Sequence, residues 1–184
     1  YSLGQGGMDI LRKEKNLEVD EKVGLKPDEL KKIIGDYDAI LIRSATKLTA
    51  DIIEAGKKLR VIGRAGVGVA IVELEAATQR GFIVMNTPEG NTLSTAELSF
   101  SMMMAVARNI PQADAHVKKG EWKRNKFQGT ELNGKTLGIV GFGRIGREVA
   151  KRASAFNMKV MVFDPFISKE SVKQYPVEFV DVPV

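Results

Sequence analysis

Short apolar runs alternate with amphipathic stretches through the first half of the chain. Apolar residues at helical spacing, as at Leu30, Ile33 and Ile34, indicate helices, and Pro27 suits a first helical position. Helices are predicted over residues 8–13, 27–34, 50–58 (capped by Thr49) and 71–79, the last stopped by Gly81. Strands are predicted over residues 17–19, 39–42, 60–62 and 82–85. This alternation predicts a parallel sheet with helices on both faces.

The second half opens on two predicted helices, residues 93–108 and 112–119, which Pro111 separates. A polar loop over residues 120–135 follows. The alternation then resumes, with strands predicted over residues 136–140, 159–163 and 177–180 and a helix over residues 144–156. We place a domain boundary near residues 86–88, which divides this α/β chain into residues 1–86 and 87–184.

Composition narrows the possible chemistry. The 184 residues include no cysteine, which excludes disulfides, thiol catalysis and Cys-ligated metals. The net charge of +5 is mild, and the densest basic cluster, residues 118–126 around Trp122, favours a solvated or subunit-facing surface over a nucleic-acid site. The longest apolar stretch is too short for a membrane span, and no signal peptide is visible. We therefore expect a cytoplasmic protein without membrane or nucleic-acid partners.

Residues 141–146 form a G-x-G-x-x-G motif, Gly141-Phe142-Gly143-Arg144-Ile145-Gly146. It follows an apolar run and opens a predicted helix, which is the context that a dinucleotide-binding turn requires. Gly141 permits the tight turn, Gly143 lets a pyrophosphate approach the backbone, and Gly146 lets the helix pack on the strand. The helix N-terminus, including Arg144 and Ile145, offers N–H donors to the phosphates.

Asp164 ends the next apolar run, 18 residues after Gly146. This is close to the spacing at which such folds place the acidic residue that binds the adenosine ribose. Its carboxylate would repel a 2′-phosphate, by about 4 kcal/mol for unit charges 4 Å apart at an effective dielectric of 20. No basic residue follows Asp164 before Lys169. The motif therefore predicts NAD rather than NADP as the cofactor.

Several longer segments match one protein family, namely residues 42–47, 63–69, 74–78, 86–88, 96–98, 120–124 and 127–146. Through them the chain resembles the D-isomer-specific 2-hydroxyacid dehydrogenase family, in particular its members that act on 3-phosphoglycerate. The resemblance implies a flavodoxin-like substrate domain followed by the first half of a Rossmann NAD-binding domain. It also implies NAD-dependent oxidation of 3-phosphoglycerate to 3-phosphohydroxypyruvate, the entry to serine biosynthesis, in a homodimer or homotetramer.

The resemblance also implies site residues. Arg43 and Ser44 match a substrate-binding segment, and Arg64 and Gly66 are expected beside them, because guanidinium groups suit a phosphorylated carboxylate. Val67 matches the turn beside the nicotinamide. The basic segment at Arg124 matches one that reaches toward a neighbouring subunit.

Some family features have no counterpart here. The catalytic His, Arg and Glu of the family are expected beyond Val184, and the family's opening strand before Ser2, so the chain resembles part of a longer enzyme. His116 does not match the catalytic position, and we expect it to be exposed or at an interface. The pair Ala70-Ile71 stands where the family has Asp-Asn, which leaves a poor helix cap and an exposed Ile71.

Three alternatives stay open from the sequence. The first is a sister enzyme of the same family that acts on glyoxylate or another small 2-hydroxy acid. A nucleotide-sensing, corepressor-like binding protein has the same fold, although the arginine segment disfavours it. A catalytically inactive fragment that associates with longer subunits is the third.

Overall fold

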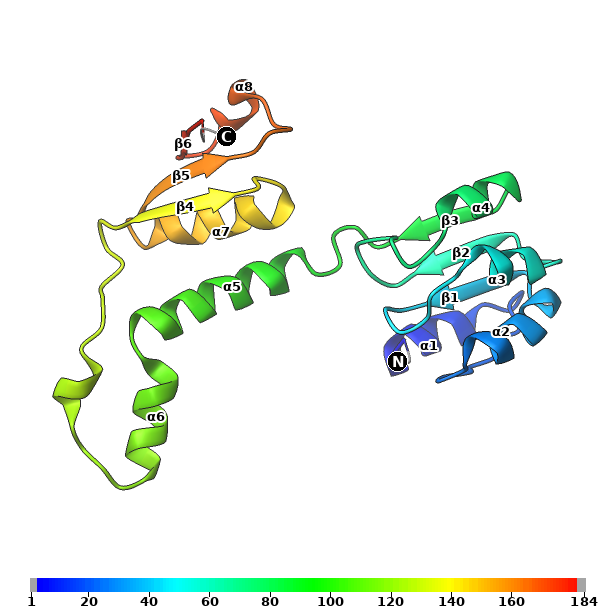
Figure 1. The fold of residues 1–184 in the computed structure, drawn as a ribbon, viewed down its shortest axis with the longest axis horizontal. Helices are drawn as coiled ribbons and strands as arrows, with labels where there is room; N and C mark the ends of the chain where they lie inside the picture. The colour runs from blue at the N-terminus through cyan, green and yellow to red at the C-terminus, as the bar shows by residue number, and fades with distance from the viewer. Residues whose placement is uncertain (1–2, 182–184) are drawn as a thin grey trace. The chain divides into compact units, whose positions relative to one another are not determined.

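A computed structural model describes residues 3–181, which form two compact units that divide between Gly90 and Asn91 (Figure 1). The predicted α/β class is confirmed, since both units contain a parallel sheet with helices between the strands. No helix within residues 3–181 is long and apolar enough to cross a membrane.

The first unit holds a parallel three-stranded sheet in the order β1-β2-β3. The strands are β1 (Ala39–Ile42), β2 (Val61–Arg64) and β3 (Ile83–Asn86), and the helices are α1 (Gln5–Lys13), α2 (Pro27–Ile33), the 3-10 turn η1 (Ile34–Asp36), α3 (Ala50–Ala55) and α4 (Leu74–Gln79). Buried residues of α2, α3 and α4, among them Leu30, Ile53 and Ala77, pack with Ile42 and Ile62 of the sheet. Burial of this apolar surface stabilises the unit.

The opposite face of this sheet is less covered than predicted. Leu41, Ile83 and Met85 alternate with the core-facing residues of their strands and remain exposed. The strand predicted over residues 17–19 is wrong, because that segment has no regular secondary structure and pairs with no described strand, and Leu17 is exposed. A strand of three residues has little to stabilise it without a hydrogen-bonded neighbour.

The helix predictions in this unit erred at their ends. The helix predicted over residues 50–58 ends at Ala55, where Gly56 takes over as C-cap. The helix predicted from residue 71 begins at Leu74, because residues 69–72 form a turn in which the Val72 N–H donates to the Val69 carbonyl. Thr49 is the N-cap residue of α3, but its hydroxyl donates to the Asp51 carboxylate instead of accepting from the helix backbone.

The second unit holds a parallel sheet in the order β4-β5-β6. Its elements are α5 (Thr92–Ala107), α6 (Ile110–Lys118), η2 (Arg124–Phe127), β4 (Thr136–Val140), α7 (Arg144–Ala155), β5 (Lys159–Phe163), α8 (Lys169–Val172) and β6 (Glu178–Phe179). The bounds predicted for β4 and β5 are confirmed. Asn109, at a φ of +53°, separates α5 from α6, whereas Pro111 lies in the first turn of α6 and not in the linker.

Helices α5 and α7 pack on each other in this unit. The Phe100 and Phe156 rings meet edge to face, with centroids 4.9 Å apart. Arg152 of α7 donates to the carboxylates of Glu148, at 2.7 Å, and of Glu97 on α5, at 3.1 Å. These contacts hold the C-terminal half of α7 against α5.

Candidate functional site

The glycine-rich turn joins β4 to α7, and its three glycines meet three different requirements. Gly141 has a φ of +93°, a conformation that residues with a side chain rarely adopt. A Cβ on Gly146 would overlap the Gly141 carbonyl oxygen and would lie 3.4 Å from Cγ2 of Ile139. At Gly143, the N-cap of α7, nothing lies within 4 Å of the position of a Cβ. The fold therefore requires glycine at 141 and 146, and the space at Gly143 lies beside the first N–H groups of the helix.

Asp164 follows the last residue of β5, as predicted, but its carboxylate is engaged within the protein. The residue is 9% exposed, and its Oδ2 accepts a hydrogen bond from the Phe142 N–H at 2.7 Å. Its Oδ1 accepts from the Phe166 N–H at 2.8 Å. Each oxygen keeps a second lone pair for a ribose hydroxyl. Sequence reasoning gave Asp164 a ligand role alone and missed that the same carboxylate anchors the turn.

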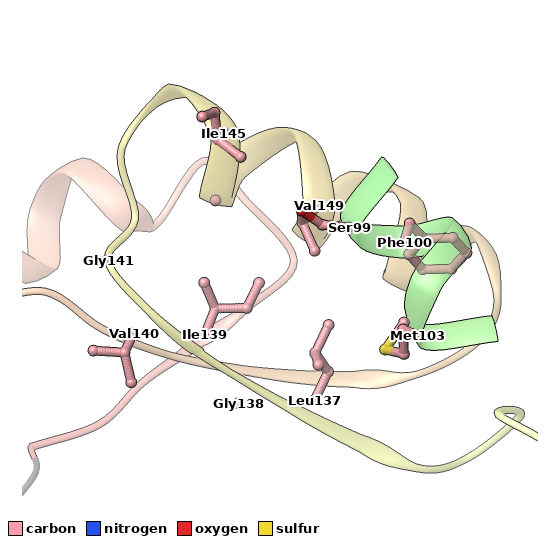
Figure 2. Close-up of a pocket in the computed structure, with 11 residues that line it drawn as sticks. Ser99, Phe100, Met103, Leu137, Gly138, Ile139, Val140, Gly141, Ile145 and Val149 are labelled. Carbon is pink, nitrogen blue, oxygen red and sulfur yellow. The ribbon is translucent and has the colours of Figure 1, made fainter. Parts of the chain in front are cut away.

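An apolar groove of about 470 Å³ lies between β4, α5 and α7 (Figure 2). Its lining residues are Ser99, Phe100, Met103, residues 137–141, Ile145, Gly146 and Val149. None of these side chains is charged, so the groove offers nothing that would select a phosphate. Among the groups at the turn, the backbone N–H groups at the start of α7 are the ones suited to an anion.

The predicted substrate residues of the first unit lie at the carboxyl ends of its strands. Ile42 is in register with Arg64, so Arg43 and Arg64 come from the same end of adjacent strands. Arg43 and Ser44 are exposed, directly after β1. This is the edge at which open α/β sheets bind ligands.

Arg64 is folded beneath its own loop. A Cβ on Gly66 would lie 3.1 Å from the Arg64 guanidinium carbon, and one on Gly68 would lie 3.3 Å from its Nη1. The Nε atom is buried and has no hydrogen-bond partner among the described residues. An unpaired buried donor is costly, and an anionic ligand is one group that would satisfy it.

The loop that covers Arg64 is held by the last residue of β3 and the residue that follows it. The Asn86 side-chain amide donates to the Val67 carbonyl, and the Thr87 N–H donates to the Gly66 carbonyl at 3.1 Å. Sequence reasoning missed this function of Asn86 and Thr87, although residues 86–88 were among the segments that carried the family resemblance. Long-range hydrogen bonds of this kind leave no local sequence pattern.

Two expectations about Ala70-Ile71 are wrong. Helix α4 has Glu73 as its N-cap, so Ala70 is not at a capping position and the predicted penalty does not arise. Ile71 is half-buried and packs against the first core, and its carbonyl accepts from the Leu48 N–H at 2.8 Å. Isoleucine at this position therefore contributes to the core of the first unit.

The expectation for His116 is also wrong in part, since its side chain is only 11% exposed. Its ring meets Phe127 edge to face, with centroids 5.0 Å apart, and its Nδ1 lies 3.4 Å from the Glu121 carboxylate. His116 thus holds the basic segment against α6. Arg124, predicted to reach a neighbouring subunit, is exposed at the start of η2.

Comparisons with known proteins agree on one family. The model of the D-isomer specific 2-hydroxyacid dehydrogenase catalytic domain matches residues 1–181. The chain is 51% identical over 179 residues to D-3-phosphoglycerate dehydrogenase of Archaeoglobus fulgidus, covering 97% of this chain and 34% of the relative. It is 57% identical over 167 residues to the enzyme of that name from Rattus norvegicus, covering 88% of this chain and 31% of the relative.

A similar solved structure is D-lactate dehydrogenase from Aquifex aeolicus, complexed with NAD and lactic acid. Its TM-score is 0.73 at 29% identity, over 85% of this chain and 46% of that one. The chain spans about a third of the length of the two curated relatives.

Proposed function

The chain belongs to the D-isomer-specific 2-hydroxyacid dehydrogenase family, and we propose that the protein oxidises 3-phosphoglycerate to 3-phosphohydroxypyruvate with NAD as hydride acceptor. The observation that carries the proposal is the occurrence in one chain of two separate features. One is a dinucleotide-type turn with Asp164 at the end of the next strand, and the other is a pair of arginines at the carboxyl edge of a second sheet.

The residues of the second unit fit a nicotinamide dinucleotide. The open space at Gly143 and the N–H groups at the start of α7 would receive the pyrophosphate, with Gly141, Arg144, Ile145 and Gly146 shaping the turn. The free lone pairs of Asp164 would accept from the ribose hydroxyls, and its charge would disfavour a 2′-phosphate. The bound cofactor supplies the acceptor for a hydride from the substrate carbon that bears the hydroxyl.

The residues of the first unit fit a phosphorylated carboxylate. Arg43 and Arg64 would pair with its anionic oxygens, and Ser44 and the backbone at Gly66 would border the ligand, whereas the resemblance assigns Val67 to the nicotinamide. The unpaired Nε of Arg64 supports this assignment. Loss of the hydroxyl proton requires a base, and the resemblance assigns that role to a histidine other than His116.

The surface of α5 supports self-association. Leu98, Met102 and Val106 recur at intervals of four residues and so lie on one side of the helix, and all three are exposed, Val106 to 78%. Exposed apolar stripes of this kind mark contact surfaces. We propose that a second copy of the chain covers this stripe.

Turnover by the full-length protein tests the proposal. Reduction of NAD should be followed with 3-phosphoglycerate, glycolate and D-lactate as alternative substrates. We expect the phosphorylated acid to have the highest kcat/KM, and Arg43→Met to reduce that preference. Comparable turnover of the unphosphorylated acids would point to a sister enzyme. NAD binding without any turnover would point to a sensor.

A further inference from the structure

Arg147 contacts the glycine-rich turn but has no part in the function proposed above. It lies on α7, and its Nε donates to the Phe142 carbonyl at 3.1 Å. Its guanidinium carbon lies 5.8 Å from the centroid of the Phe142 ring and 5.5 Å from that of Tyr175. The two rings meet edge to face, with centroids 5.2 Å apart. Arg147 therefore contacts both the backbone and the ring of Phe142.

Phe142 is held through both of its backbone polar groups by side chains of opposite charge. Asp164 accepts from its N–H, and Arg147 donates to its carbonyl. The Phe142 ring is fully buried. With both hydrogen bonds in place, neither of the peptide planes that flank Phe142 can rotate without losing a charge-assisted contact. One of these planes carries the Gly143 N–H, which is the entry to α7.

We propose that Arg147 is a positioning residue for dinucleotide binding. It fixes the Phe142 peptide, and thereby the direction of the N–H groups that follow, before the ligand arrives. Tyr175, which lies between α8 and β6, keeps the guanidinium in place through its ring. The inference rests on the proposed function for its ligand, whereas the clamp on Phe142 can be measured without one.

The test compares three variants of the full chain. Arg147→Met keeps the aliphatic stem but removes the donor and the charge. Arg147→Lys restores a charged donor. Lys151→Met removes one positive charge from an exposed position on the same helix, which controls for net charge. Two quantities are measured for each variant, the dissociation constant for NADH by fluorescence titration and the amide exchange rate of Phe142 and Gly143 by NMR.

We expect Arg147→Met to speed amide exchange in the turn and to raise the NADH dissociation constant about tenfold, the size expected for loss of a hydrogen bond to a charged group. Arg147→Lys should recover part of both effects, and Lys151→Met should change neither. Unchanged exchange in Arg147→Met would overturn the clamp. Faster exchange with unaltered NADH binding would overturn its role in binding. If the parent chain binds no NADH, the proposed function fails, and the exchange rates still decide whether Arg147 clamps the turn.

Discussion

Replacing Gly146 by alanine tests the packing of the glycine-rich turn. The new Cβ would overlap the Gly141 carbonyl oxygen, which is backbone and cannot rotate away, and would lie 3.3 Å from the carbonyl carbon. Overpacking of this kind costs about 1–3 kcal/mol, and occasionally more. Alanine recovers close to 1 kcal/mol, because it favours a helix interior more than glycine does. The difference between these two effects is a net loss of up to about 2 kcal/mol in the free energy of unfolding. We expect a value near 2 kcal/mol, because the carbonyl that the Cβ meets is rigid backbone.

Gly143→Ala is the matched control, because its Cβ would meet nothing within 4 Å. It replaces an N-cap glycine by alanine, a change that costs about 1 kcal/mol or less. Urea denaturation followed by circular dichroism gives the free energy of unfolding of both variants. We expect Gly146→Ala to be the less stable variant, and Gly143→Ala to fold but to lose NADH binding. A Gly146→Ala protein as stable as the parent would refute the packing argument.

Three further outcomes are expected. Asn86→Ala should raise the KM for 3-phosphoglycerate several-fold, the effect of losing about 1 kcal/mol of hydrogen bonding at the Val67 carbonyl. The pKa of Asp51 is held below its usual 3.8 by hydrogen bonds, first from the Thr49 hydroxyl and then from Lys31. Its stabilisation is therefore present above pH 3.8 and is lost as the pH falls through the lowered value, so the melting temperatures of Asp51→Asn and the parent should converge in acid. Val106→Asp should shift the sedimentation coefficient toward that of a monomer, and an unchanged coefficient would exclude the α5 stripe as the contact between copies.

The strands that could be predicted correctly are apolar runs bounded by polar residues. Strands β1, β4 and β5 begin and end where the pattern predicted them to. The strand predicted over residues 17–19 is wrong because a strand needs a hydrogen-bonded partner, and a local pattern does not reveal whether a partner is present. The start predicted for α4 is wrong for a related reason. Ile71 is apolar at helical spacing, but its carbonyl accepts the Leu48 N–H in the isolated β-bridge between Leu48 and Val72.

The glycine-rich turn was predictable because its constraints are local. The positive φ at Gly141 and the close packing at Gly146 each require a glycine, and the two glycines stand at a fixed spacing in the sequence. The groups that hold the turn and the loop are not local. Asp164 is 22 residues from Phe142, and Asn86 is 19 residues from Val67. Such pairs can be identified only from the folded structure.

The position of Arg64 under its loop has a consequence for changing the substrate preference of such a protein. Because Gly66 and Gly68 leave room for the guanidinium, that group fills the space that their missing side chains create. A substitution of Arg64 therefore changes the charge of the site and the packing of the loop at the same time. A shorter neutral residue at position 64 would remove a positive charge and also leave a void beneath the loop. A redesign for unphosphorylated acids would have to refill that void, for example by adding side chains at positions 66 and 68 in the same step.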